Sequence, residues 1–335
     1  MRALVSTELA HHSKATLTHD APDPTPLAGQ VLVDVYSAGL NFFDDMSSRV
    51  KSLKVHRYLK VARLSEVTEF LVPGRKDCRQ EGIITLIAFD PTDPVFFPVP
   101  ANEIAPLPDN LTYDEGAGLY VTFPTTYEGL VGRANLKPGE WVLVTAAAGG
   151  IGMSALQLAR ILGGRVIAAA GSQDKMEIAK RLGGADYTVN YKVSMLSTTP
   201  LDLFKASILE KVVQVMSVTL TLVDSFKCIA FKGRTIVVGF SGGIEKVPTN
   251  LILLKNISVL GIFWGAYRNN ERARIAEVWR ELLEIFKSGK LKPVVNPEVY
   301  SLERVTEGLS ALEHRKTWGK VIARVREENA TKSKL

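Results

Sequence analysis

The sequence is poor in cysteine and has no long apolar segment. Only two of its 335 residues are cysteines, Cys78 and Cys228, and neither lies in a CxxC or Cys/His spacing. They are expected to be buried thiols rather than a disulfide or zinc ligands. No apolar run approaches the roughly 18–20 residues that span a bilayer. Glu8 and His11 come too early for the apolar core of a signal peptide, so we expect a protein kept inside the cell.

Acidic residues are missing from one stretch of the chain. The net charge is +6, from 41 Lys and Arg against 35 Asp and Glu, yet residues 46–65 hold six basic residues and no acid. A basic stretch can bind nucleic acid or another anionic surface. Few aromatic side chains interleave with these charges for base stacking, so a solvated surface segment is the favoured interpretation.

The last residues match a targeting signal. The chain ends in Ser333-Lys334-Leu335, which matches the peroxisomal import signal, and the preceding residues 326–332 are polar. The sequence therefore predicts recognition by the peroxisomal import receptor and a peroxisomal location; without that signal the expected location is the cytoplasm.

The hydrophobic pattern predicts an α/β protein of two domains. After a β-like opening at residues 30–38, Thr112 and Glu115 form a capping box that announces a helix. Strand and helix patterns then alternate to about residue 263, which predicts a doubly wound parallel sheet. The strands are expected at 141–144, 165–169, 235–240 and 257–263, and the helices at 151–162 and 175–182. An amphipathic helix is expected at 271–288.

A glycine-rich turn lies between the first of these strands and its helix. Residues 145–152 read TAAAGGIG, so Ala147 takes the first position of a GxGxxG pattern. Gly149 lets the backbone approach a phosphate, Gly150 and Ile151 continue the turn, and Gly152 lets the helix pack on the strand. The strand–turn–helix context is the one that dinucleotide binding requires, so we predict a nucleotide site rather than a purely structural turn.

The end of the second strand indicates which nucleotide binds. NAD-preferring sites carry Asp or Glu about 20 residues beyond the glycine turn. Here the strand ends at Ala170-Gly171, without a carboxylate, and Ser172 and Lys175 can hold a 2′-phosphate. Asp174 fits an acid in the first turn of a helix. The predicted cofactor is NADPH.

Taken together, these features resemble the zinc-free quinone oxidoreductase (zeta-crystallin-like) branch of the medium-chain dehydrogenase/reductases. The similarity covers about residues 1–45, 100–191 and 224–325. Its motifs are Asn41-Phe42-Phe43-Asp44, Leu136-Lys137-Pro138-Gly139-Glu140, the 146–152 loop, Gly183-Gly184-Ala185-Asp186, Gly239-Phe240 and Gly319-Lys320.

The resemblance implies a Rossmann domain at residues 123–263 and a GroES-like β-rich substrate domain made of residues 1–122 and 264–335. It implies hydride transfer from NADPH to a quinone or activated alkene in a dimer or tetramer. No zinc is expected, because the Gly-His-Glu segment and the cysteine cluster of the zinc relatives are missing. Reduction of 2-enoyl thioesters or alkenals is an alternative that a peroxisomal location would suit.

The resemblance also assigns residues. Ser172, Lys175 and Tyr191 would bind the 2′-phosphate, and Lys320 would face the cleft. Asn41 would orient the substrate oxygen or the ribose, and Asp44 is a catalytic or a structural carboxylate. The residues implied near the nicotinamide are Asn41, Thr125, Phe240, Phe263 and Trp264, and Gly239 is implied as a cofactor-binding residue. For Phe240, Phe263 and Trp264, core packing is an equally good interpretation.

Two stretches, residues 45–82 and 193–222, depart from the family. The first is basic with poor β alternation, and the second lacks the Asp and Gly that the family's fourth strand carries. An altered reading frame or splice error would explain the abrupt change; otherwise the site is rebuilt in two places. A non-catalytic NADPH- or RNA-binding relative, or a non-functional product, therefore stays open beside the reductase.

Overall fold

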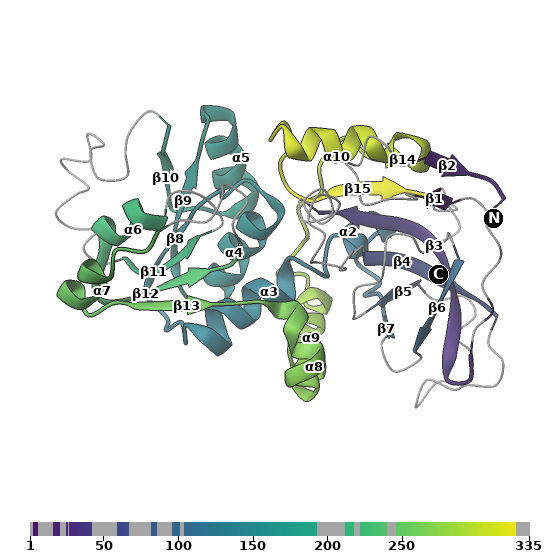
Figure 1. Ribbon diagram of the computed structural model, residues 1–335, viewed down its shortest axis with the longest axis horizontal. Helices are drawn as coiled ribbons and strands as arrows, with labels where there is room; N and C mark the ends of the chain where they lie inside the picture. Colours follow the sequence, from purple (N-terminus) through teal and green to yellow (C-terminus); the bar gives the residue numbers. More distant parts are fainter. Residues whose placement is uncertain are drawn as a thin grey trace. The chain divides into compact units, whose positions relative to one another are not determined.

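A computed structural model describes residues 3–5, 16–20, 25, 27–41, 59–66, 82–85, 96–100, 104–192, 212–217, 222–239 and 246–325. The chain forms two compact units, residues 1–120 with 295–335, and residues 121–294. Residues 264–294 group with the second unit, whereas the family resemblance implies that they lie with the chain ends. The reason is helix α9 (Arg272–Lys287), whose Phe286 packs edge-on against Phe123 of α3 (Phe123–Tyr127), with ring centroids 5.0 Å apart (Figure 1).

The first unit is built on antiparallel β-structure. Its seven-stranded sheet has the order β14-β15-β3-β4-β5-β7, with β6 also paired to β3. The strands are β14 (Tyr300–Ser301), β15 (Val321–Arg324), β3 (Gln30–Leu40), β4 (Leu59–Glu66), β5 (Gly82–Thr85), β6 (Phe96–Pro100) and β7 (Ile104–Pro106). A separate ribbon pairs β1 (Ala3–Val5) with β2 (Thr16–Thr18), and the helices are α2 (Tyr113–Ala117), η6 (Leu302–Arg304) and α10 (Val305–Glu313). The strand β4 lies inside the stretch 45–82, where the sequence showed poor alternation.

Helix α2 begins where the capping box predicts. The Thr112 hydroxyl accepts a hydrogen bond from the Glu115 N–H at 3.2 Å, and the Glu115 carboxylate accepts one from the Thr112 N–H at 2.9 Å. These reciprocal bonds satisfy two amides that the first turn leaves without helical partners.

The second unit is a doubly wound parallel sheet, as predicted. The strand order is β10-β9-β8-β11-β12-β13, and every neighbouring pair runs parallel (Figure 1). The strands are β8 (Trp141–Val144), β9 (Arg165–Ala170), β10 (Tyr187–Asn190), β11 (Val212–Ser217), β12 (Ile229–Val237) and β13 (Ser258–Gly261). The other helices are η3 (Glu128–Arg133), α4 (Gly150–Ile161), α5 (Gln173–Gly183), α6 (Leu222–Cys228), α7 (Thr249–Lys255), η5 (Trp264–Ala266) and α8 (Tyr267–Asn270).

Two strands of this sheet differ from expectation. β12 begins at Ile229 and ends at Val237, earlier than the predicted 235–240. Lys232 has a left-handed φ of 60°, which marks a local irregularity within the strand. β11 lies inside the stretch 193–222 and fills the position between β8 and β12.

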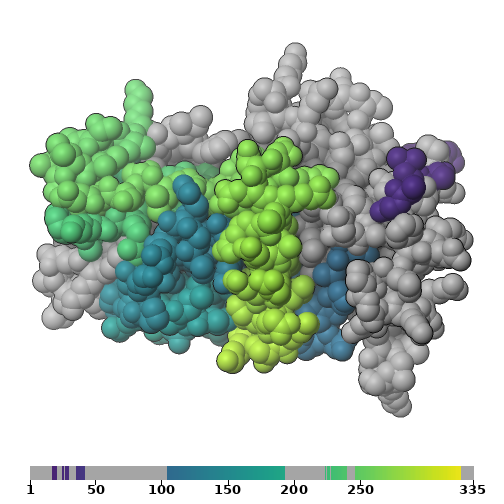
Figure 2. All heavy atoms as spheres, turned by 90° about the horizontal axis from the view of Figure 1, so that it is seen from below, coloured from purple at the N-terminus to yellow at the C-terminus, as the bar shows by residue number. Residues whose placement is uncertain are grey.

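The core of the second unit joins the sheet to its helices. Leu143, Ile167 and Phe226 are each almost fully buried, and burial of a side chain of this size contributes about 1.5–3 kcal/mol. Cys228 is a buried free thiol in the same cluster, as expected, whereas Cys78 lies outside the described residues. Helix α9 turns Val278, Trp279 and Leu282 inward, while its exposed residues reach the surface seen in Figure 2 in yellow-green.

No helix among the described residues combines the length and the apolar character needed to cross a membrane.

Candidate nucleotide-binding site

The glycine-rich turn has the geometry of an anion cradle. β8 ends at Val144, and α4 begins at Gly150 after the extended N-cap Gly149 (φ −76°, ψ 173°). Gly149 donates its N–H to the Ala146 carbonyl at 2.9 Å, and Ala147 donates to the Ala169 carbonyl of β9 at 3.0 Å. Because Gly149 has no side chain, it cannot cap the first amides of α4. Those amides point out of the helix N-terminus, where they can bind phosphate oxygens.

Close packing of backbone explains Gly152. A Cβ on Gly152 would lie 2.5 Å from the Ala146 oxygen and 2.6 Å from the Ala147 Cα. No side chain fits there unless the turn moves. A Cβ on Gly149 would lie 3.3 Å from the same oxygen, which is tight but not prohibitive. Ala146 itself has a left-handed φ of 49°, a conformation that costs an alanine about 1–2 kcal/mol and that clusters at functional sites.

The turn lies at the switch point of the sheet. Strands β9 and β10 continue to one side of β8, and β11, β12 and β13 continue to the other. In sheets of this order, ligands bind beyond the carboxyl ends of the strands where the order reverses. Ala147, Gly149, Gly150, Ile151 and Gly152 all lie at this position, as the sequence predicts.

The three residues expected around the 2′-phosphate lie at the ends of β9 and β10. Ser172 is the N-cap of α5, and its hydroxyl accepts a hydrogen bond from the Lys175 N–H at 3.4 Å. The two strands pair in parallel with Asn190 opposite Ala170. Tyr191 then donates its N–H to the Ala170 carbonyl at 3.2 Å. The structure therefore brings Ser172, Lys175 and Tyr191 to one edge of the sheet.

Gly171 marks the place where an NAD-preferring enzyme would carry its acid. A Cβ on Gly171 would lie 3.1 Å from Cε of Lys192 and 3.3 Å from Cε2 of Tyr191. Lys192 is not among the residues that the sequence predicts for this site. The available signal was a cation directly after Tyr191, beyond the third strand of the unit.

Helix α3 is tied to the nucleotide turn. The Thr126 and Ser154 hydroxyls are 2.7 Å apart, and Ser154 also donates to the Ile151 carbonyl at 2.8 Å. Thr125, the residue expected near the nicotinamide, is buried on this helix at 7% exposure. Its position is therefore coupled to the first turn of α4.

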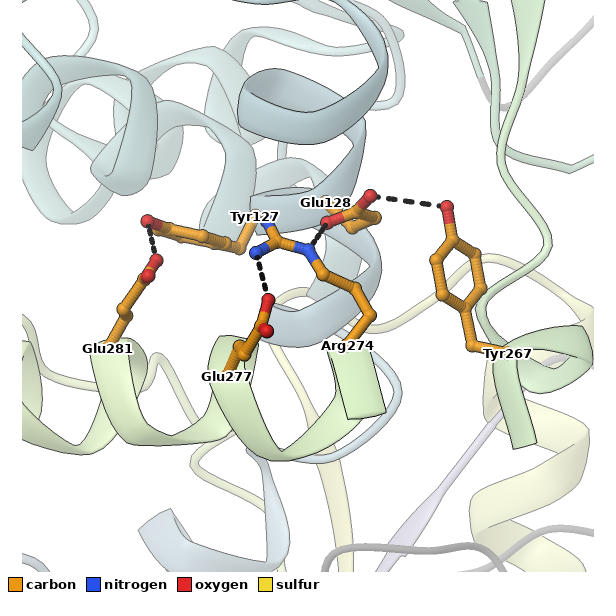
Figure 3. A network of polar contacts seen from close by, with 6 residues as sticks. All are labelled: Tyr127, Glu128, Tyr267, Arg274, Glu277 and Glu281. Atoms are coloured by element: carbon orange, nitrogen blue, oxygen red, sulfur yellow. Dashed lines mark hydrogen bonds and ion pairs between the residues drawn. The ribbon is translucent and has the colours of Figure 1, made fainter. Parts of the chain in front are cut away.

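A buried carboxylate links α3 and η3 to the helices α8 and α9 (Figure 3). Glu128 accepts hydrogen bonds from Arg274 Nε at 3.0 Å and from the Tyr267 hydroxyl at 3.2 Å. A Cβ on Gly132 would overlap the Glu128 carboxylate, so that carboxylate fills the space of the missing side chain. Burial, followed by the charge and the hydrogen bond of Glu128, raises the pKa of Tyr267 to about 12.

A second phenol belongs to the same network. The Tyr127 hydroxyl donates to the Glu281 carboxylate, and Arg274 also pairs with Glu277 at 3.0 Å (Figure 3). Burial, then the hydrogen bond to Glu281, raises the pKa of Tyr127 well above its ordinary value. Both phenols are therefore protonated donors at neutral pH; Tyr127 fixes α9 against α3, and Tyr267 fixes α8 against η3.

The aromatic residues after β13 differ in their surroundings. Trp264 is buried and stacks on Tyr267, with ring centroids 5.0 Å apart and an interplanar angle of 27°. Phe263, in contrast, is 56% exposed, which does not fit core packing. Gly239 lies half-buried just beyond β12. Phe240 and Asp44 lie outside the described residues.

The first unit brings together Asn41 and Lys320, which are 279 residues apart in sequence. Both are buried, and Lys320 Nζ donates to Oδ1 of Asn41. Asn41 Nδ2 donates in turn to the Gly39 carbonyl at 3.3 Å, and a Cβ on Gly39 would lie 2.7 Å from Cε of Lys320. An ammonium can be buried in this way only when polar partners replace its water.

Within the described residues, no group of three or more His, Cys, Asp and Glu side chains is arranged to hold a metal ion.

Comparisons with known proteins agree with this geometry. Residues 150–287 match a family described as zinc-binding dehydrogenase. The chain is 31% identical over 328 residues to quinone oxidoreductase-like protein 2 of Rattus norvegicus, covering 96% of this chain and 91% of that protein. The corresponding protein of Bos taurus is 36% identical over 218 residues, 64% of this chain but only 62% of the bovine protein's length.

One solved structure is similar along nearly its whole length. This is the quinone oxidoreductase of Thermus thermophilus, determined alone and in complex with NADPH. It superimposes with a TM-score of 0.78 at 28% identity, covering 97% of this chain and 100% of that one.

Proposed function

Since this chain belongs to the zinc-free quinone oxidoreductase branch of the medium-chain dehydrogenase/reductase superfamily, we propose that it is an NADPH-dependent reductase of quinones or activated alkenes that works without zinc. The observation that carries the proposal is the edge formed by β8, β9 and β10. At this edge, helix α4 begins with two residues that have no side chain, Gly149 and Gly150. The neighbouring strand β9 is followed by Gly171, where an NAD-preferring site would carry a carboxylate.

The residues present fit the two phosphate groups of NADPH. The amides of Gly150, Ile151 and Gly152 would bind the pyrophosphate, because they lie in the first turn of α4 and the N-cap Gly149 has no side chain to cap them. The Ser172 hydroxyl and the Lys175 ammonium would hold the 2′-phosphate by hydrogen bond and by charge, together with the Tyr191 hydroxyl.

The rest of the site orients reactants and excludes water. NADPH, when bound, supplies a hydride, so the acceptor gains two electrons and takes its proton from solvent or a nearby polar group. We propose that Thr125, Gly239, Phe240, Phe263 and Trp264 border the nicotinamide. In the first unit, the buried Lys320 ammonium fixes the Asn41 carboxamide, which can then orient an acceptor oxygen by hydrogen bonding.

The test has two stages on the purified full chain. NADPH and NADH are first titrated separately by fluorescence, and NADPH is expected to bind more tightly. NADPH oxidation is then followed with quinones, alkenals and 2-enoyl thioesters as acceptors, and turnover is expected with at least one class. Binding without turnover on every acceptor would support the non-catalytic alternative, and no binding of either nucleotide would overturn the proposal.

Peroxisomal import through Ser333-Lys334-Leu335 is a separate proposal that rests on the sequence alone. The same hydride and proton can reduce a quinone or a 2-enoyl thioester, and a peroxisomal location would suit the thioester.

A further inference from the structure

Resting on the proposed NADPH site, we infer that Lys192 is a 2′-phosphate-binding residue and that it sets the preference for NADPH over NADH. Lys192 lies neither in the glycine-rich turn nor at the N-terminus of α5.

Gly171 directly follows the second strand of the unit. In NAD-preferring sheets of this kind, an acid at the end of the second strand binds the ribose hydroxyls. Strand β9 ends at Ala170, so position 171 is the next residue along this path. A Cβ there would lie 3.1 Å from Cε and 3.4 Å from Cδ of Lys192. The space that an acidic side chain would enter is thus narrowed by the stem of a lysine.

The charge at this place is therefore inverted. The ammonium of Lys192 is one bond beyond Cε, so a positive charge stands close to where related sites carry a negative one. A phosphate monoester carries a charge of about −1.5 to −2 at neutral pH. It is attracted by this charge, whereas a free ribose hydroxyl gains little from it.

The backbone holds Lys192 in this position. Tyr191 is bonded to the Ala170 carbonyl, and Lys192 donates its N–H to Oδ1 of Asn190 at 3.0 Å. The tyrosine is thereby bonded to the end of β9, and the backbone of Lys192 is held to the last residue of β10. The aliphatic stem packs over Gly171 while the residue as a whole stays exposed, so its ammonium is accessible to a ligand.

The experiment measures binding constants of the full chain for NADPH, NADH, 2′,5′-ADP and 5′-AMP, the last two differing only in the 2′-phosphate. Lys192→Ala is expected to weaken NADPH and 2′,5′-ADP about fivefold, as for one exposed charge pair, and to leave NADH and 5′-AMP unchanged. Lys192→Glu is expected to weaken the phosphorylated pair further. Lys180→Ala, an exposed lysine in the last turn of α5, is the matched control and should change none of the four.

Gly171→Asp tests the same position by adding the acid that NAD-preferring sites carry there. The new carboxylate would meet the Lys192 stem, so NADPH should weaken while NADH is retained or improves. Equal losses for all four ligands in the Lys192 variants, or no change in any, would overturn the inference while wild-type NADPH binding still supports the proposed function. A wild-type chain that binds neither NADPH nor 2′,5′-ADP overturns both.

Discussion

Replacement of Gly152 by alanine tests whether the nucleotide turn is as closely packed as the structure shows. In an open helix this change would stabilise the protein by about 1 kcal/mol, because alanine is the better helix former. Here the new Cβ would lie 2.5–2.6 Å from three backbone atoms of Ala146 and Ala147, about 1 Å inside normal contact. Overpacking of this kind costs about 1–3 kcal/mol. The clash therefore outweighs the propensity, and the free energy of unfolding should fall.

Binding should suffer more than stability. Moving the turn by about 1 Å displaces the amides of residues 150–152 from the phosphate oxygens, and each hydrogen bond to a charged group is worth about 1.5–3 kcal/mol. Loss of one such bond weakens NADPH binding about 10- to 100-fold. NADH should weaken by the same factor, because both nucleotides share the pyrophosphate.

Two other glycines provide a graded control. Gly149→Ala places its Cβ 3.3 Å from the Ala146 oxygen, and Gly261→Ala on β13 meets nothing within 4 Å. Urea unfolding and nucleotide titration of the three variants should rank them 152, 149, 261 from largest to smallest effect. A Gly152→Ala protein as stable as wild type, with unchanged NADPH affinity, would refute the reasoning.

Other predictions concern the buried carboxylate and the chain end. Glu128→Ala leaves Arg274, whose side chain is 24% exposed, without its buried partner, and should lower the free energy of unfolding by about 2–4 kcal/mol in a urea titration; a loss under about 0.5 kcal/mol would contradict the role of the pair. Stability should decrease as the pH rises from 10 through about 12, because the folded state holds the Tyr267 proton more tightly than the unfolded chain. Tyr267→Phe should flatten this slope, and identical slopes would rule out the tyrosine as its cause. A fluorescent protein fused to the N-terminus should collect in peroxisomes and spread to the cytoplasm when residues 333–335 are removed; unchanged distribution would remove the import proposal.

The sequence predicted the sheet around the nucleotide turn well because its signals are local. The apolar run at Trp141–Val144, the glycines that follow and the helical stripe of α4 lie next to one another in the chain. The absence of an acid at Gly171 could likewise be read directly. The capping box of α2 is another local signal, and both of its hydrogen bonds are present.

Contacts between distant residues could not be predicted from local patterns. The pairing of Asn41 with Lys320 and that of Glu128 with Arg274 depend on packing of elements far apart in the chain. The expected domain boundary at residue 263 differs from the units of the structure for the same reason. The amphipathic pattern of α9 shows that one face is buried but not which unit that face packs against. Lys192 could not be predicted from the local pattern, because its proposed role depends on how its stem packs against Gly171, which lies 21 residues earlier in the chain.

The carboxylate of Glu128 has a consequence for how the sequence can vary. It occupies the volume that a side chain at position 132 would need, so a change at 132 requires the carboxylate to move. A descendant that gained even a methyl group at 132 would have to turn the acid at 128 away from the arginine at 274, or replace it, and that arginine would keep its ion pair with Glu277 but lose the buried one. Substitutions at these three positions should therefore be correlated among related sequences, and a comparison of those sequences can test this.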